Sequence, residues 1–249
     1  MAEQNFLNLT EKQLDEPIYR IMKEQYVLDL FVQKKNVISQ VKNWKDKFEN
    51  FQLALGGVLD GRKFTYSFKD DFGGQCWSRS YLSEAMWGIY ANDPTERYLR
   101  IRSTPRKLLA GLTQAHASTW HQTCFLGKVS YCTEKRLIEF LGEGGPMPLS
   151  AHRFAQSLLL KRRAFRHENE VRLLFFGNNG DFNNRGLYRY DVDPHTMITQ
   201  IMADPNRNRT NWKSDKSKIR DATGFTGQIK RSKTYDPPVW QPPIYTSGG

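Results

Sequence analysis

The sequence predicts a mixed α+β fold with one main domain. Apolar residues alternate as in strands in some segments and recur at helical spacing in others, in irregular succession. No regular strand–helix–strand alternation supports a doubly wound parallel sheet. The 249 residues are 39% hydrophobic and 13% aromatic, which is enough for a well-buried core. We expect an N-terminal arm over residues 1–15, a domain over 16–235 and an extended tail over 236–249.

Short strands and helices are mixed in the first half of the chain. Alternating apolar residues predict strands at 17–22, 37–41, 75–80 and 98–103. Apolar residues at helical spacing predict helices at 26–33, 83–91 and 105–117. The turn sequence Asn92-Asp93-Pro94 ends the second of these helices, and Pro105 opens the third.

The second half continues the mixture. A strand is expected at 125–132, followed by a helix at 134–141 that Thr133 caps and the glycine-rich stretch 142–146 ends. A longer helix over 151–167 is expected to lead into an apolar strand that begins at Glu168. A strand at 187–192 and a helix over 193–202 complete the predicted elements.

Several classes of protein are excluded by what the sequence lacks. It has no run of about 18 apolar residues, so we expect no membrane span. Its first residues are polar and contain no signal-peptide core, which favours the cytoplasm. Three cysteines without C-x-x-C spacing indicate neither a disulfide framework nor a zinc site, and the five histidines show no metal-ligand pattern.

The net charge of +11 favours a polyanionic partner, with nucleic acid ahead of a membrane surface. The segment 205–235 is basic and is interleaved with Trp212, Phe225 and Tyr235, which fits phosphate contacts combined with stacking of single-stranded bases. The alternative is a solvated basic surface. The residues expected to bind nucleic acid are Arg162, Arg163, Arg207, Arg209, Lys213, Lys230 and Arg231.

Two carboxylates stand at the predicted start of the apolar strand. Residues at i and i+2 of a strand point to the same face, so Glu168 and Glu170 are expected to project together. Carboxylates held this close repel each other unless a positive charge lies between them. A site that stabilises a cationic transition state uses such a pair of carboxylates. The alternative is a solvated strand start with both glutamates paired to Arg166 and Arg172.

Three further features are candidates for the same site. Arg20 on the first strand suits bidentate binding of a diphosphate, or it pairs with a nearby carboxylate. Ser78 suits a hydrogen bond to a sugar, or it is ordinary strand-end polarity. Trp87 and Tyr90 lie three apart on one helix and suit stacking on a flat ring, although core packing is the simpler explanation of Trp87.

The order of Arg20, Ser78 and the late Glu168-x-Glu170 pair resembles the R-S-E pattern of NAD-dependent ADP-ribosyltransferases. The serine motif here is Cys-Trp-Ser-Arg-Ser and not Ser-Thr-Ser, which leaves the role of Ser78 open. Residues 17–235 are also similar to a bacterial domain-of-unknown-function family associated with phage defence. The segments that carry this likeness are Ile18-Tyr19-Arg20, Cys76-Trp77-Ser78, the helical stretch 86–91 and the strand start 168–172.

The resemblance implies an ADP-ribosyltransferase-like fold, with a split mixed or antiparallel sheet flanked by helices. It also implies NAD as a substrate and no metal. Arg20, with Tyr19 beside it, would bind the NAD diphosphate, and Ser78 would orient the nicotinamide-side ribose. Trp87 or Tyr90 would stack on the nicotinamide.

The same resemblance assigns the chemistry to the two glutamates. Glu170 would bind the ribose 2′-hydroxyl and stabilise the oxocarbenium-like state as nicotinamide leaves. Glu168 would orient or deprotonate the acceptor. Among such enzymes, a strongly basic member resembles the nucleic-acid-modifying toxins of the DarT and CmdT kind.

Three functions follow from these observations. The first is an ADP-ribosyltransferase toxin of anti-phage defence that modifies nucleic acid, single-stranded RNA in preference to DNA, and that has a neutralising antitoxin protein as partner. The second is a nucleic-acid-binding subunit of a defence complex without catalysis. The third is a nuclease that uses the carboxylates and Lys161, although Val171 stands where the lysine of a Glu-x-Lys metal motif is expected.

Overall fold

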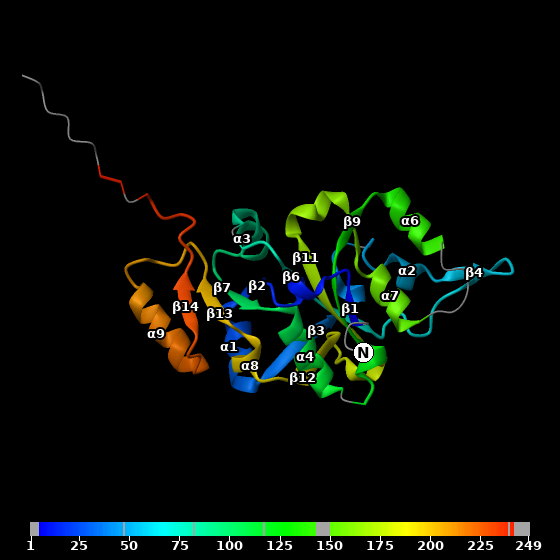
Figure 1. The fold of residues 1–249 in the computed structure, drawn as a ribbon, viewed down its shortest axis with the longest axis horizontal. Coiled ribbons are helices and arrows are strands. Elements are labelled where there is room, and N and C mark those ends of the chain that lie inside the picture. Colours follow the sequence, from blue (N-terminus) through cyan, green and yellow to red (C-terminus); the bar gives the residue numbers. More distant parts are fainter. Residues whose placement is uncertain are drawn as a thin grey trace, which may run out of the picture.

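A mixed β-sheet forms the centre of the structure, and helices cover both of its faces (Figure 1). This arrangement confirms the predicted α+β class. The computed structural model describes residues 5–46, 48–81, 83–116, 118–142, 150–238 and 240–241. The first residues of the predicted arm (1–4), the predicted helix end at 117, the glycine-rich stretch from 143 and the end of the predicted tail (242–249) lie outside the described residues.

The main sheet has the strand order β1-β8-β11-β6-β2-β7-β13-β14, and β3 and β12 join it beside β6. β1 pairs with β8 and β13 with β14 in parallel, and the other pairs are antiparallel. The strands are β1 (Phe6–Leu7), β2 (Ile18–Lys23), β3 (Lys35–Gln40), β6 (Phe72–Ser78), β7 (Tyr98–Ser103), β8 (Cys124–Lys128), β11 (Glu170–Phe176), β12 (Leu187–Asp191), β13 (Gln200–Ala203) and β14 (Gln228–Arg231).

Two small sheets lie beside the main one. β9 (Ser130–Cys132) pairs in parallel with β10 (Leu160–Arg162), and β4 (Gly57–Leu59) pairs with β5 (Arg62–Phe64). The first of these matters for the site because it places Lys161 opposite Tyr131.

The main sheet splits at one edge of β6. Near its end β6 pairs with β2 through a single residue pair, Ser78 with Tyr19. Near its start it pairs with β3, through Gly73 and Gly74. Between these two contacts, residues 75–77 have no strand partner on this edge within the part of the chain that is described. The sheet therefore opens between β2 and β3.

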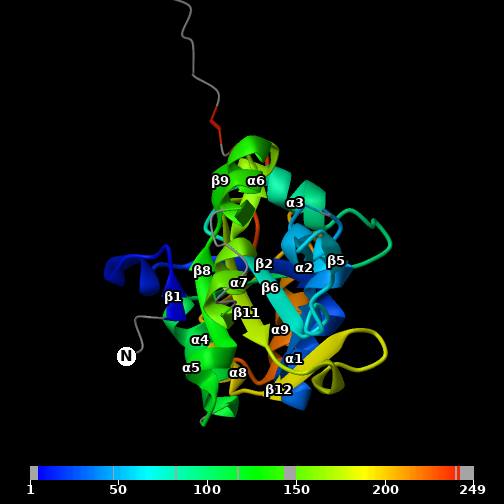
Figure 2. The same cartoon turned by 90° about the vertical axis from the view of Figure 1, so that its right-hand side faces the viewer.

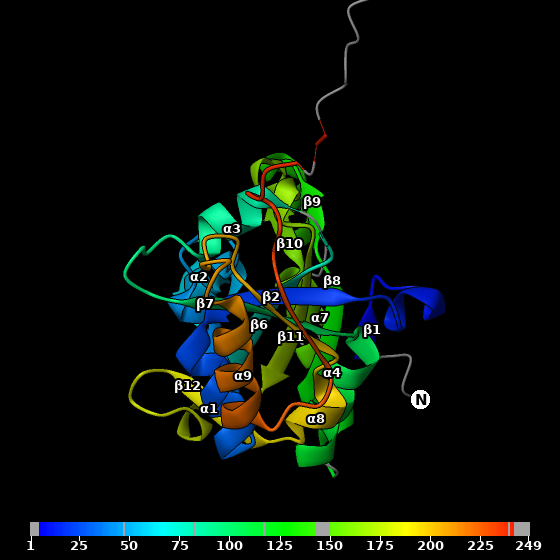
Figure 3. The same cartoon turned by 90° about the vertical axis from the view of Figure 1, so that its left-hand side faces the viewer.

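The two faces of the sheet carry different helices (Figures 2 and 3). The face that includes Val171, Leu173 and Phe175 packs against a large apolar core. The helices α1 (Glu24–Gln33), α4 (Pro105–Ala115), α8 (Pro194–Met197) and α9 (Trp212–Thr223) contribute buried residues to this core. The opposite face, with Leu174, packs against α2 (Phe51–Leu55) and α7 (Ala151–Ser157), and α3 (Glu84–Tyr90) covers the same face over β2 and β7.

The remaining helices are short. α5 (Trp120–Thr123) precedes β8, and α6 (Glu134–Gly142) follows β9. The 3-10 helices are η2 (Glu11–Leu14), η3 (Val41–Asn43), η4 (Arg163–Glu168) and η5 (Asn179–Asp181). Of the described helices, none combines the length and the apolar character needed to cross a membrane.

Three predicted elements are wrong in ways that affect the site. The helix expected over 151–167 is α7, then β10, then η4, because Leu158 and Leu159 enter the core and β10 pairs with β9. The helix expected over 193–202 ends at Met197, and β13 follows as an inner strand. The strand expected over 125–132 is two strands in different sheets, since the chain leaves the main sheet at Val129.

The apolar face of β6 depends on a close approach at Gly74. A Cβ atom there would lie 2.3 Å from the ring atom Cζ2 of Trp44 and 3.2 Å from Cδ2 of Leu174. We expect Gly74→Ala to lower the free energy of unfolding by about 1–3 kcal/mol, because the sheet is packed on both sides of this position. Urea unfolding measures this change.

Gly88 provides the matched control. It lies in α3, and a Cβ atom there would meet no atom of the described residues within 4 Å. Gly88→Ala should stabilise the protein slightly, by about 0.5–1 kcal/mol, because alanine favours a helix over glycine. A Gly74→Ala variant as stable as the parent would contradict the packing described above.

Candidate functional site

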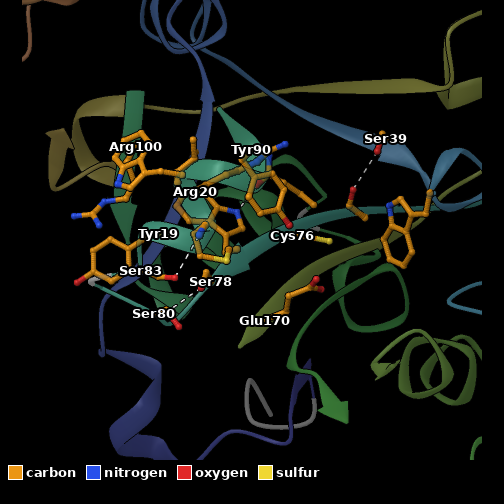
Figure 4. A pocket seen from close by; sticks show the side chains of 17 residues that line it. Tyr19, Arg20, Ser39, Cys76, Ser78, Ser80, Ser83, Tyr90, Arg100 and Glu170 are labelled. Carbon is orange, nitrogen blue, oxygen red and sulfur yellow. Dashed lines mark hydrogen bonds between the residues drawn. The ribbon is translucent and has the colours of Figure 1, made fainter. Parts of the chain in front are cut away.

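The split in the sheet opens into a cavity of about 200 Å³. β2 and β6 form its floor, α3 covers it, and Glu170 from the start of β11 lies at one side (Figure 4). Aromatic and sulfur-containing side chains make up much of the wall: Trp44, Trp77, Met86, Trp87, Tyr90 and Cys76. The concave shape and the few polar groups that converge on it are typical of a small-molecule site.

Six of the residues singled out from the sequence line this one cavity: Tyr19, Arg20, Ser78, Trp87, Tyr90 and Glu170. They come from four elements that lie far apart in the chain. The register of the sheet explains part of this convergence, because Tyr19 pairs with Ser78, and Ser78 pairs with Glu170, across three neighbouring strands. Side chains of cross-strand partners lie on the same face of a sheet.

Glu170 belongs to a buried cluster of five charged side chains, which we name the Lys161 cluster: Glu49, Lys161, Glu168, Glu170 and Arg172. The ammonium group of Lys161 lies 2.6 Å from Glu168, 2.7 Å from Glu170 and 3.0 Å from Glu49. The guanidinium of Arg172 contacts Glu170 at 2.7 Å and Glu49 at 2.6 Å. Its third donor reaches the carbonyl oxygen of Leu158 at 2.6 Å.

The Lys161 cluster corrects the expected geometry of the two glutamates. Glu168 is the last residue of η4 and not part of the strand, and Asn169, with a φ of 46°, turns the chain before β11 begins at Glu170. Both carboxylates nevertheless meet at Lys161. The alternative of a solvated strand start is wrong, because both glutamates are buried, although Arg172 does pair with Glu170 as that alternative expected.

The surroundings of the two glutamates in the cluster shift their pKa values in opposite directions. Burial raises the pKa of Glu168 to about 8, and its contact with Glu170 adds to this shift. Burial also acts to raise the pKa of Glu170, but the positive charges of Arg172 and Lys161 outweigh it and lower that pKa well below its usual range. At neutral pH Glu168 therefore holds a proton while Glu170 is ionised. Pairs of carboxyl groups with pKa values pushed apart are frequent in active sites.

Arg20 lies in the split between β2 and β6 and contributes a positive charge to the cavity, which Glu170 lines with a negative one. None of the described residues forms a hydrogen bond or an ion pair with its side chain. Burial lowers the pKa of its guanidinium, and the groups that act on it through space are Cys76, Tyr90 and Tyr190. A partly buried guanidinium without a carboxylate partner favours an anionic ligand.

A second guanidinium, that of Arg100 on β7, was not predicted and also lines the cavity. It lies 4.6 Å from the ring centre of Tyr19 and 5.1 Å from that of Tyr81. One of its terminal nitrogens donates to the backbone carbonyl of Tyr81, and the other, Nη2, is buried and has no hydrogen-bond partner among the described residues. Burial lowers the pKa of Arg100 as well.

Ser78, Trp87 and Tyr90 have different surroundings. The hydroxyl of Ser78 donates to the backbone carbonyl of Glu168 at 2.7 Å and accepts from the backbone N–H of Ser80 at 3.0 Å, so it ties β6 to the end of η4. Trp87 is buried against Tyr98 and Met202, as core packing predicts. Tyr90 remains 37% exposed at the cavity, and burial of its hydroxyl raises its pKa.

The residues expected to bind nucleic acid differ in their exposure and in their ion pairs. Arg163, Arg209, Lys213 and Lys230 are exposed. Arg162 pairs with Asp46 at 3.1 Å, and Arg231 pairs with Asp236. Arg207 is buried and bound to Glu24, Asp204 and Asp215, so its charge is balanced inside the fold.

Sequence reasoning missed the partners that organise the site. Glu49, Arg100 and Trp44 carried no local signal, because each meets the site only through a distant segment of the chain. The sequence did not predict that Lys161 binds both glutamates. Over the described residues, the structure shows no group of three or more His, Cys, Asp or Glu side chains placed to hold a metal ion.

Neither a protein-family model nor a curated protein matches this chain. Among solved structures it is similar to Thermus sp. 2.9 DarT in complex with carba-NAD+, at 8% identity and a TM-score of 0.38, over 90% of this chain and 98% of that chain. The same protein in complex with ADP-ribosylated ssDNA is 10% identical, with a TM-score of 0.37, over 88% of this chain and 94% of that one. At such scores, the function of this chain has to be argued from its own residues.

The proton on Glu168 makes stability depend on pH. The pKa of Glu168 is about 8 in the folded protein and near its usual value of 4.5 in the unfolded chain. Between these values the folded state holds a proton that the unfolded state has lost, so raising the pH from 5 to 8 lowers the free energy of unfolding. Urea unfolding across this range should show the decline, and Glu168→Gln should reduce it. An equal decline in both proteins would contradict the assignment.

Lys161 carries the central charge of the cluster. Lys161→Met leaves three buried carboxyl groups around an apolar side chain, and we expect it to lower the free energy of unfolding by about 3–5 kcal/mol. The matched control is Lys23→Met, since Lys23 pairs with Glu96 at 2.7 Å on the surface. That control should change stability little. Equal effects of the two substitutions would show that the cluster does not hold the fold together.

Proposed function

We propose that this protein is an NAD-dependent ADP-ribosyltransferase with an ADP-ribosyltransferase-like fold, and that it modifies nucleic acid with RNA as the preferred acceptor. The observation that carries the proposal is that one positive and one negative side chain line the same cavity. Arg20, which has no anionic partner among the described residues, and the ionised Glu170 both line it. A dinucleotide with a central diphosphate and a ribose beside the bond to be broken needs both charges.

In the proposed reaction Arg20 binds the diphosphate and Tyr90 stacks on the nicotinamide. Glu170 accepts a hydrogen bond from the ribose 2′-hydroxyl. The bond between ribose C1′ and the nicotinamide nitrogen then breaks, its electron pair leaves with nicotinamide, and Glu170 stabilises the positive charge that develops on the ring. The acceptor atom forms the new bond to C1′ and releases its proton to water.

Several groups of the site would serve this reaction indirectly. Lys161 and Arg172 hold Glu170 from behind, each through a different carboxylate oxygen, and keep it ionised. Glu168 does not line the cavity but shares the ammonium group of Lys161 with Glu170. We therefore assign Glu168 the role of positioning Glu170. The acceptor role that the resemblance implies does not suit a carboxyl group that holds a proton at neutral pH and lies outside the cavity lining.

The acceptor and the biological setting follow from charge. A net charge of +11 favours a polyanion over a protein acceptor. An enzyme that modifies RNA in the cytoplasm harms the cell that makes it, so we propose a neutralising antitoxin protein as partner and anti-phage defence as the role.

Transfer from labelled NAD tests the proposal. Purified protein is incubated with NAD labelled in its adenylate phosphate and, separately, with RNA, single-stranded DNA or total protein. We expect label on RNA with the parent. Glu170→Gln should lower the rate by about 10²–10³-fold, because it removes the charge that stabilises the transition state. Arg20→Ala should weaken NAD binding and raise KM.

Glu96→Gln and Arg189→Ala serve as controls, since both residues are exposed and lie outside the cavity. Both should label RNA like the parent, and thermal melting establishes that the site variants fold. Bound but unmodified RNA, with no release of nicotinamide, would favour the binding module instead. Cleaved RNA, with no dependence on NAD, would favour the nuclease.

A further inference from the structure

The strand β14 and the helix α9 lie at the opposite end of the sheet from β1 (Figure 1). A second hollow, separate from the cavity, lies beside them. It encloses about 840 Å³ between α9 and the chain that follows β14, and we name it the α9 groove. Met202 of β13 and Ile229 of β14 also line it, and its far wall is the segment 232–237.

The α9 groove carries five cationic side chains against one carboxylate. Arg231 pairs with Asp236, which accounts for the carboxylate. The other four have no ion pair or side-chain hydrogen bond with any described residue: Arg209, Lys216, Lys230 and Lys233. They come from three segments of the chain and face one hollow, so their mutual repulsion favours a bound polyanion.

Two aromatic side chains give the groove surfaces for stacking. Trp212 lies one helical turn before Lys216 on α9, and both line the groove. Tyr81 lines it from the loop after β6 and is 43% exposed. Cations that alternate with flat rings in a concave track are typical of sites for single-stranded nucleic acid, whose unpaired bases stack on aromatic side chains.

Tyr81 also connects the groove to the cavity. Its ring lies 5.5 Å from that of Tyr19 and 5.1 Å from the guanidinium of Arg100, and both of these residues line the cavity. The far wall of the groove also contacts the helix that covers the cavity, because the hydroxyl of Tyr235 donates to Glu84 at the start of α3 at 2.7 Å. A strand in the α9 groove therefore passes Tyr81, which contacts two residues of the cavity wall.

We propose that the α9 groove holds a single strand of RNA and that Tyr81 stacks on the base next to the one presented to the cavity. The proposal deepens the function proposed above and rests on it for the choice of RNA as acceptor. The exposed hydroxyl of Thr234 in the groove wall offers a hydrogen-bond partner for a ribose 2′-hydroxyl, which DNA lacks. Binding at the groove itself needs no NAD.

A charge-reversal variant with a matched control tests the groove. The groove variant is Lys216→Glu with Lys230→Glu and Lys233→Glu, and the control is Lys63→Glu with Lys69→Glu and Lys107→Glu, which changes the net charge equally on exposed lysines elsewhere. Fluorescence anisotropy with a labelled single-stranded RNA of about ten nucleotides measures binding. We expect the groove variant to bind at least ten-fold more weakly than the control.

Two further measurements sharpen the result. The slope of log Kd against log salt concentration should decrease by about 2 in the groove variant, because three phosphate contacts are lost. Tyr81→Leu should weaken binding by about ten-fold while Tyr81→Phe retains it, because stacking needs the ring and not the hydroxyl. Equal RNA binding by the groove and control variants would overturn the proposal that the α9 groove binds RNA. Tighter binding of single-stranded DNA than of RNA would overturn the choice of RNA as the ligand.

Nicotinamide release from NAD without RNA separates this proposal from the one on which it rests. The charge-reversal variant leaves the residues of the cavity unchanged, so it should release nicotinamide like the parent. If no protein releases nicotinamide while RNA binding still depends on the groove, only the transferase proposal fails. If RNA is modified equally by groove and control variants, only the groove proposal fails.

Discussion

The Lys161 cluster is the interaction on which the rest of the site depends. Five charged side chains are removed from water here, and they come from the segment before α2, from β10, from η4 and from β11. Burial of charge is unfavourable unless every charge is matched, and three carboxyl groups with two cations balance only when one carboxyl group holds a proton. Glu168 holds it, which leaves Glu170 ionised at the cavity. The same contacts thus join the folded segments and set the charge of the site.

The split of the sheet forms the cavity that the ionised Glu170 lines. Because β2 and β3 share one edge of β6, the sheet opens between them, and the cavity lies in the opening. A chain of buried hydrogen bonds closes the inner side, from Trp77 to Gln75 at 2.7 Å and from Gln75 to Asn36 at 2.9 Å. Arg20 and Arg100 also line the cavity, and neither has a carboxylate partner among the residues that the structure describes. The fold therefore keeps positive groups unpaired at one part of the cavity and the ionised Glu170 at another, an arrangement suited to a ligand that carries an anion.

Two surfaces of different character meet at Tyr81. The cavity is small and largely aromatic, whereas the α9 groove is wider and cationic. The first suits a compact ligand with specific polar contacts, and the second suits a polymer bound mainly through its phosphates. Much of the net charge of +11 is spread over other faces or balanced in ion pairs, as at Arg207 and Arg162. A local excess of unpaired positive side chains, as in the α9 groove, distinguishes a binding surface from a charged surface that only keeps the protein in solution.

The sequence alone determined the α+β class, most strand and helix positions, and six residues of the cavity, because these follow from local apolar spacing and from residue chemistry. It misassigned 151–167 as one helix, since the basic residues around Lys161 suit a helix locally and only pairing with β9 selects a strand. Glu49, Arg172 as the partner of Glu170, Arg100 and Tyr81 acquired their roles through contacts between segments far apart in the chain. The tertiary structure also decided which basic residues are free, because an ion pair depends on what packs nearby and not on the order of residues.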